Sequence, residues 1–139
     1  MPFDLDRFTT AQDRAYGEVL AELRAGRKAS HWMWFIFPQM KELGRSQTSR
    51  YYGITGLDEA RAYLAHPVLG ARLRECTGLV NGHAGTPIDV ILGHVDALKF
   101  RSSMTLFATA APGDGLFIKA LDTFYGGAPD QATLELLGQ

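Results

Sequence analysis

The 139-residue chain carries 14 Lys and Arg against 15 Asp and Glu, a formal net charge of −1, so it lacks the basic surplus typical of nucleic-acid-binding proteins. Its hydrophobic fraction of 46% and charged fraction of 21% are typical of a soluble globular domain, here spanning residues 1–139. The longest apolar run, 32–37, is far shorter than the ~20 residues that a membrane span requires. The lone Cys76 cannot form an internal disulfide, and no segment resembles a secretory signal. We therefore expect a cytoplasmic protein that binds neither nucleic acid nor membranes.

Apolar residues recur at helical spacing along most of the chain. The first such stretch, 4–25, is followed by Gly26, which is placed to stop a helix. Later helical stretches are expected over 58–65, 67–80, 87–92, 96–111, 114–124 and 130–137. No stretch alternates convincingly with period two, so the sequence predicts an all-α fold, a compact single-domain multi-helix bundle.

A ten-residue segment, 30–39, contains both tryptophans and two of the eight phenylalanines. Because residues 32–37 are all apolar, periodicity does not distinguish a short helix, which Ser30 would cap, from a buried extended run; we favour the helix. Pro38 disfavours helical backbone at the residue before it, so any helix ends there. The glycine-rich and hydroxyl-rich stretch 39–56 predicts a long irregular connection with about one helical turn.

Three polar clusters are candidates for function, and the first flanks the tryptophans: Ser30, His31 and Gln39. A histidine beside two indole rings suits a general base, or a contact to a ligand whose planar group stacks on the rings. The alternative is structural, with His31 satisfying a backbone group at a helix start while the tryptophans fill the core.

The second cluster places two cations and three hydroxyls within seven residues: Lys99, Arg101, Ser102, Ser103 and Thr105. Ammonium and guanidinium groups donate charge-assisted hydrogen bonds to phosphate or carboxylate. On a regular helix the five cannot all face one site, and the pairs compatible at spacing i, i+4 are Lys99 with Ser103 or Arg101 with Thr105. The alternative is a solvated face with one ion pair, either to Asp96 or to a partner helix.

The third cluster, Gly44-Arg45-Ser46, can present backbone N–H groups and a guanidinium to an anion, although such a sequence also suits a plain surface loop. Helix charges such as Glu22 and Glu59 are expected to be solvated, and Cys76 falls on an apolar stripe as a small core side chain. Metal-ligand spacings such as Cys-x-x-Cys, nucleotide glycine fingerprints and nucleophile elbows are lacking, so we expect no metal and no cofactor.

Two long motifs, SHWMWFIFPQ at 30–39 and LKFRSSMTLF at 98–107, together with 44–46 and 57–70, are specific. They resemble a widespread bacterial domain family of unknown function whose members are often labelled "calpastatin". The resemblance covers almost the whole chain and implies a compact all-α fold, but no activity. The label itself fits poorly, because calpain inhibitors of that name are long disordered chains, whereas this sequence is short, hydrophobic and well capped.

We predict that the three clusters converge in one pocket that binds a small anionic or nucleotide-like molecule. The predicted ligand-binding residues are Trp32, Trp34, Gln39, Arg45, Ser46, Lys99, Arg101, Ser102 and Ser103. A second hypothesis is an enzyme, a hydrolase or transferase, that uses His31 as general acid or base in the same pocket. A third is a non-catalytic protein-interaction module with exposed aromatic side chains. The ligand, the reaction and the oligomeric state stay open at this point.

Overall fold

The computed structural model describes residues 3–139, and the regular secondary structure within them is helical. The elements are α1 (Asp6–Ala25), α2 (Met33–Ile36), the 3₁₀ helix η1 (Lys41–Leu43), α3 (Gln47–Tyr51), α4 (Leu57–Ala65), α5 (Leu69–Asn81), α6 (Ile88–Leu92), α7 (His94–Ala110), α8 (Gly115–Tyr125) and α9 (Gln131–Leu136). The only β-type pairing in this range is an isolated bridge between Met40 and Ile54. The predicted all-α fold is confirmed. None of the helices in residues 3–139 has the length and apolar character to cross a membrane.

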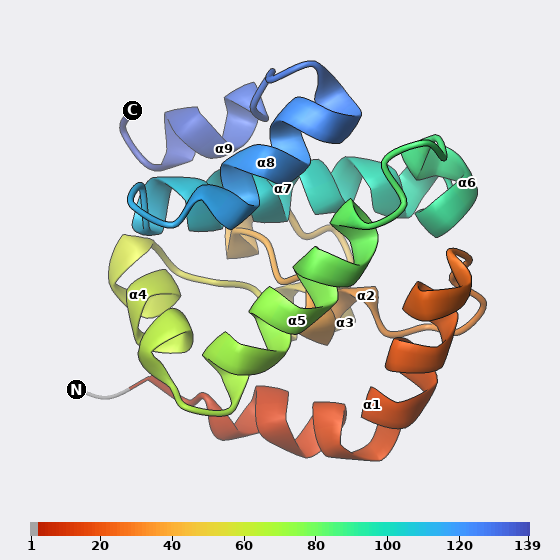
Figure 1. Ribbon diagram of the computed structural model, residues 1–139. Coiled ribbons are helices and arrows are strands. Elements are labelled where there is room, and N and C mark those ends of the chain that lie inside the picture. The colour runs from red at the N-terminus through yellow and green to blue at the C-terminus, as the bar shows by residue number, and fades with distance from the viewer. Residues whose placement is uncertain (1–2) are drawn as a thin grey trace.

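Helix α7 is the central element of the fold. It contacts α4, α6, α8 and α9, and Figure 1 shows it crossing the body behind α8. Residues 102–107 are all buried, so this part of α7 is covered on every side, rather than along the single face that its apolar spacing predicted. Ser102 and Thr105 tolerate this burial because each hydroxyl donates to a carbonyl one turn earlier, at 3.2 and 2.8 Å.

The 30–39 segment packs directly on this central helix. Its middle forms the short helix α2, which ends before Pro38 as predicted. The ring of Phe37 meets that of Phe100 edge to face at 4.8 Å, a geometry that aromatic pairs prefer. Ser30 does not cap α2, because the N-cap position is Trp32; the Ser30 hydroxyl donates instead to Glu22 Oε2 at 2.6 Å.

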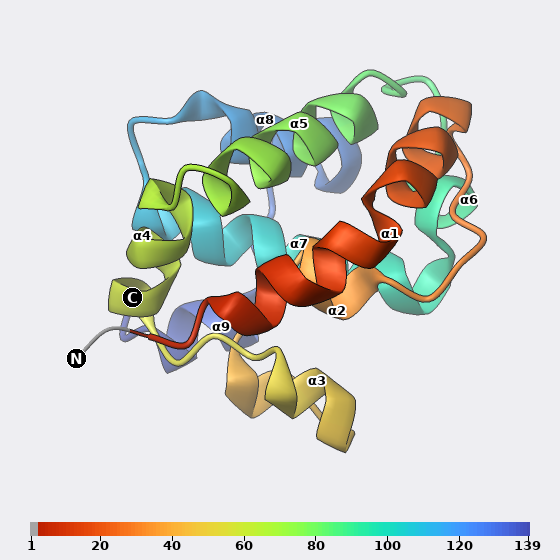
Figure 2. The same ribbon diagram turned by 90° about the horizontal axis from the view of Figure 1, so that it is seen from below.

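The connection 39–56 is more ordered than the sequence predicted, since it contains both η1 and α3. A capping box starts α3: Ser49 N donates to Ser46 Oγ at 3.1 Å, and Ser46 N donates to Ser49 Oγ at 3.0 Å. A Cβ at Gly53 would lie 2.3 Å from Lys41 Cα, so only glycine lets the backbone at position 53 approach the backbone at position 41 this closely. Figure 2 shows α3 standing out from the body on the side away from α5.

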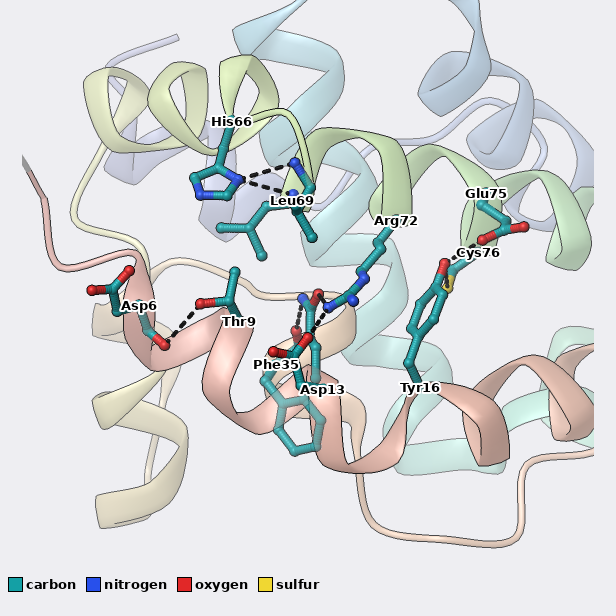
Figure 3. A network of polar contacts seen from close by, with 12 residues as sticks. Asp6, Thr9, Asp13, Tyr16, Phe35, His66, Leu69, Arg72, Glu75 and Cys76 are labelled. Carbon is teal, nitrogen blue, oxygen red and sulfur yellow. Dashed lines mark hydrogen bonds and ion pairs between the residues drawn. The ribbon is translucent and has the colours of Figure 1, made fainter.

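Polar contacts join α1 to α5 over the core. Arg72 Nη1 lies 2.8 Å from Asp13 Oδ1, and Tyr16 OH donates to Glu75 Oε1 at 2.5 Å; Figure 3 shows both pairs bridging the two helices. Beside them, Cys76 is fully buried, and burial raises the pKa of its thiol to about 12. The prediction that Cys76 is a small core side chain is confirmed.

Glu59 corrects one sequence prediction, because it is only 2% exposed rather than solvated. Its Oε2 lies 3.0 Å from Arg7 Nη2, and its Oε1 accepts hydrogen bonds from Thr55 N and Oγ1 at 2.8 and 3.0 Å. A buried carboxylate requires such partners. The sequence of α4 does not predict the burial of Glu59, because its partner Arg7 lies on α1.

Candidate functional site

The three predicted clusters contribute to one pocket of ≈ 510 Å³. It opens between the α2–α3 region and the helices α7 and α9, and Figure 2 shows α3 and α9 on the same side of α7, away from α5. Six of the residues predicted for ligand binding line it: Trp34, Gln39, Arg45, Ser46, Lys99 and Ser102. The structure therefore brings together side chains that are up to 68 residues apart in the chain.

One wall of the pocket combines an aromatic ring with a cation. Lys99 Nζ lies 5.4 Å from the centre of the Trp34 ring, within the range of a cation–π contact. Lys99 Nζ is also 3.6 Å from Asp96 Oδ1, while Asp96 Oδ2 lies 2.9 Å from Lys28 Nζ. Two ammonium groups thus share one carboxylate, and this wall keeps a net positive charge.

Arg45 supplies a second positive charge. Its side chain is exposed, and it forms no ion pair with any residue in 3–139. The capping box of the next residue, Ser46, holds the loop in which Arg45 lies. A guanidinium in this position is available for charge-assisted hydrogen bonds to an anion.

Sequence reasoning missed the other half of the lining, which is mostly apolar: Leu43, Ser49, Val95, Leu98, Asp130 and Ala132. A signal for two of them was present in α7. Val95, Leu98, Lys99 and Ser102 follow the spacing i, i+3, i+4, i+7, which places them on one face of the helix. Val95 and Leu98 are 63% and 53% exposed, so the first turns of this face of α7 are not covered by neighbouring helices.

Asp130 was predicted as a helix cap, and the structure confirms that role. Its Oδ2 accepts hydrogen bonds from Thr133 N at 3.0 Å and from Thr133 Oγ1 at 2.6 Å, which satisfies the first turn of α9. The sequence around Asp130 did not indicate that it lines the pocket, because most of the other lining residues lie far from it in the chain, on or near α2, α3 and α7.

Three residues of the second predicted cluster, Arg101, Ser103 and Thr105, lie away from the pocket. Arg101 extends toward the α8–α9 connection, where its Nε donates to Ala128 O at 3.0 Å and its guanidinium carbon lies 5.4 Å from the Tyr125 ring centre. Ser103 is fully buried, and its hydroxyl finds no partner within residues 3–139. At about 100° per residue, a helix that aims Lys99 into the pocket turns Arg101 to the opposite side.

Ser30 and His31 of the first cluster also lie outside the pocket, as does Trp32, which was predicted to bind the ligand. Trp32 is 1% exposed and belongs to the core. His31 is exposed and is not part of the lining, so the hypothesis of an enzyme with His31 as acid or base in this pocket loses its geometric basis. With Trp32 buried and Trp34 half-buried, the tryptophans do not form the exposed aromatic surface that the interaction-module hypothesis requires.

Glu22, expected to be a solvated helix charge, holds Trp32 in place instead. Its Oε1 accepts from Trp32 Nε1 at 2.9 Å and from the backbone N–H groups of Ala29 and Ser30 at 2.7 and 3.0 Å. Partial burial by itself raises the pKa of Glu22, but the hydrogen bonds from Ser30, Ala29 and Trp32 outweigh it and lower the pKa to about 2. The loop after α1 is therefore closed around this carboxylate.

Metal-ligating side chains do not cluster in the described part of the chain: between residues 3 and 139 there is no group of three or more His, Cys, Asp or Glu that could hold an ion.

A family profile described as "Protein of unknown function (DUF1810)" matches residues 2–137. The chain belongs to this family. Among solved structures, it is similar to the conserved hypothetical protein Rv1873 from Mycobacterium tuberculosis, with 52% sequence identity, a TM-score of 0.97, and coverage of 100% of this chain and 99% of that chain. A search of the curated proteins finds no match. Neither the DUF1810 description nor that of the mycobacterial protein names an activity, a ligand or a calpain inhibitor.

Proposed function

We propose that this DUF1810 protein binds a small anionic molecule that carries a planar ring, in the pocket between α2, α3, α7 and α9. The observation that carries the proposal is the pairing of the Lys99 ammonium with the Trp34 ring on the wall of a pocket that also holds Arg45. The volume of ≈ 510 Å³ falls within the range of about 300–1,000 Å³ usual for small-molecule sites.

The chemistry of the lining assigns a part of the ligand to each side chain. A ring packs against Trp34 and the apolar side chains of Leu43 and Leu98, which removes both surfaces from water. A phosphate or carboxylate binds Arg45 and Lys99 by charge-assisted hydrogen bonds. Because Asp96 also pairs with Lys28, it does not fully neutralise Lys99, and the Lys99 ammonium remains available to bind an anion.

The test is a thermal-shift screen of ring-bearing phosphates and carboxylates, followed by calorimetry on each hit. A ligand at 100 times its Kd adds about 2.7 kcal/mol to the free energy of unfolding, which is a clear shift in Tm. Arg45→Ala and Lys99→Ala are expected to weaken binding at least about tenfold each, since each removes a charged hydrogen-bond donor.

Arg27→Ala and Lys119→Ala serve as matched controls, because both side chains are exposed and lie outside the pocket. Equal affinities for the wild type and the two pocket variants would overturn the proposal, as would a screen in which no ring-bearing anion shifts the Tm.

A further inference from the structure

The pocket also contains a negative charge. Asp130 lies in the same lining as Arg45 and Lys99, yet it forms no ion pair with any residue in 3–139. Both hydrogen bonds of its capping role go to Oδ2, from Thr133 N and Oγ1. Within the same residues no side chain or backbone group donates to Oδ1 in this pocket-lining carboxylate. One oxygen anchors the side chain, and the other stays an open acceptor.

The position of this carboxylate is fixed from two directions. The capping bonds to Thr133 hold the side chain, and Asp130 N donates to Thr105 Oγ1 at 2.8 Å. Thr105 Oγ1 in turn donates to Arg101 O at 2.8 Å, so the backbone of Asp130 is tied to the central helix α7. An acceptor held in this way loses little conformational entropy when it binds a donor, which favours both affinity and specificity.

We propose that Asp130 Oδ1 accepts a hydrogen bond from an amino group on the ligand's ring, and that the ligand class is therefore a nucleoside monophosphate with an amino-bearing base. This assignment rests on the proposed function above. A carboxylate only accepts hydrogen bonds, so a ring that presents an oxygen or a bare carbon at this point leaves Oδ1 unpaired. Sites built around one polar group discriminate strongly against analogues that lack its partner.

The remaining parts of such a ligand match the rest of the lining. The base packs against Trp34, and its phosphate is held by Arg45, whose fork of N–H groups fits phosphate oxygens, and by the Lys99 ammonium. Because the carboxylate does not pair with either cation, the opposite charges are separated, and the ligand that bridges them carries a donor at one end and an anion at the other.

The experiment compares adenosine monophosphate with purine riboside 5′-monophosphate, which differs only by the loss of the 6-amino group. Calorimetry on the wild-type chain is expected to give about tenfold tighter binding of the amino-bearing nucleotide, the effect of one hydrogen bond to a charged group. Asp130→Asn keeps an oxygen for the Thr133 cap but replaces the second oxygen by an NH₂ donor. This variant is expected to lose the preference for the amino-bearing nucleotide.

Asp122→Asn is the control for the charge change, because Asp122 is exposed on α8 and outside the pocket; it is expected to keep the wild-type preference. The Tm of Asp130→Asn in the absence of ligand verifies that α9 stays docked. Inorganic phosphate and L-tryptophan are two further arms, and both are expected to bind more weakly than adenosine monophosphate.

Three results would overturn the assignment while leaving the proposed function intact: equal binding of the two nucleotides by the wild type, an unchanged preference in Asp130→Asn, or tighter binding of L-tryptophan than of the nucleotide. The same holds if neither nucleotide binds while another ring-bearing anion does so in a manner that depends on Arg45. If no ring-bearing anion binds, both proposals fail together.

Discussion

Trp32 and Trp34 are two residues apart, and each has a lysine over its ring, yet they serve different parts of the molecule. Lys28 Nζ lies 5.1 Å from the Trp32 ring centre and Lys99 Nζ lies 5.4 Å from that of Trp34. Asp96 pairs with both lysines. The Trp32 side is closed, because Glu22 accepts the indole N–H. Within residues 3–139 no carboxylate accepts the Trp34 indole N–H, and the Trp34 side opens into the pocket.

The difference shows how similar contacts stabilise the fold in one place and leave a site in another. On the closed side, the lysine side chain is 8% exposed and its ammonium also donates to Ser30 O at 2.5 Å. On the open side, the lysine is 27% exposed and its distance to Asp96 is longer, 3.6 against 2.9 Å. Removing groups from the first side should cost stability, and removing groups from the second should cost binding.

The largest expected contrast is between the two tryptophans themselves. Trp32→Ala is expected to lower the free energy of unfolding by about 3–5 kcal/mol, because it leaves a cavity in the core. Trp34→Ala is expected to lower it by less than about 2 kcal/mol, since its side chain is only half-buried. Urea unfolding followed by circular dichroism measures both. Equal losses would break the distinction between a closed and an open side.

Glu22→Gln is expected to destabilise the fold by about 2 kcal/mol. Both oxygens of the carboxylate accept hydrogen bonds, whereas the amide has only one oxygen that can accept them. The pKa of Glu22 is lower in the folded chain, about 2, than its ordinary 4.5. Its contribution is therefore complete above pH 4.5 and is lost as the pH falls toward 2. Unfolding free energies across this range should fall more steeply for the wild type than for Glu22→Gln; parallel profiles would contradict the assignment.

The lysine pair gives a smaller contrast. Lys28→Ala is expected to cost about 1–2 kcal/mol, because it breaks a short, nearly buried ion pair and a hydrogen bond. Lys99→Ala is expected to cost less than about 1 kcal/mol, as is usual for partly exposed pairs, while weakening ligand binding. Chemical denaturation of the two variants in parallel is the measurement, and a reversed order of the two losses would contradict the comparison.

The smallest effect is spectroscopic. The chain has two tryptophans, so a ligand in the pocket should change the fluorescence of Trp34 and leave that of Trp32 nearly constant. Trp34→Phe is expected to abolish the ligand-dependent change, whereas the control variants Arg27→Ala and Lys119→Ala, which lie outside the pocket, should retain it. A change that persists in Trp34→Phe would place the ligand elsewhere.

The sequence predicted the helices well wherever an apolar face alternates with a polar one, and Gly26 and Asp130 marked helix boundaries correctly. It was weakest where that contrast vanishes. Residues 32–37 are uniformly apolar, and residues 102–107 are buried on every side of α7 although three of them carry hydroxyls. Burial of that kind depends on the neighbouring helices, which no local pattern contains.

For the candidate site, the sequence identified polar residue types but not the direction of each side chain. It named Lys99 and Arg101 as equivalent cations, and only the packing of α7 shows that the first faces the pocket while the second contacts Tyr125. Glu22 looked like a surface charge because its partners follow the end of α1 and fold back on it. Asp130 was recognised by its capping pattern alone, which gave no sign of a second role.

The burial of Cys76 has a practical consequence. Thiol reagents attack the thiolate, and a side chain with no exposed surface and a pKa near 12 reacts only when the surrounding helices separate. The single thiol of this chain is therefore a natural probe of opening of the native structure. Its alkylation rate in dilute denaturant reports the equilibrium between closed and open molecules without an engineered cysteine.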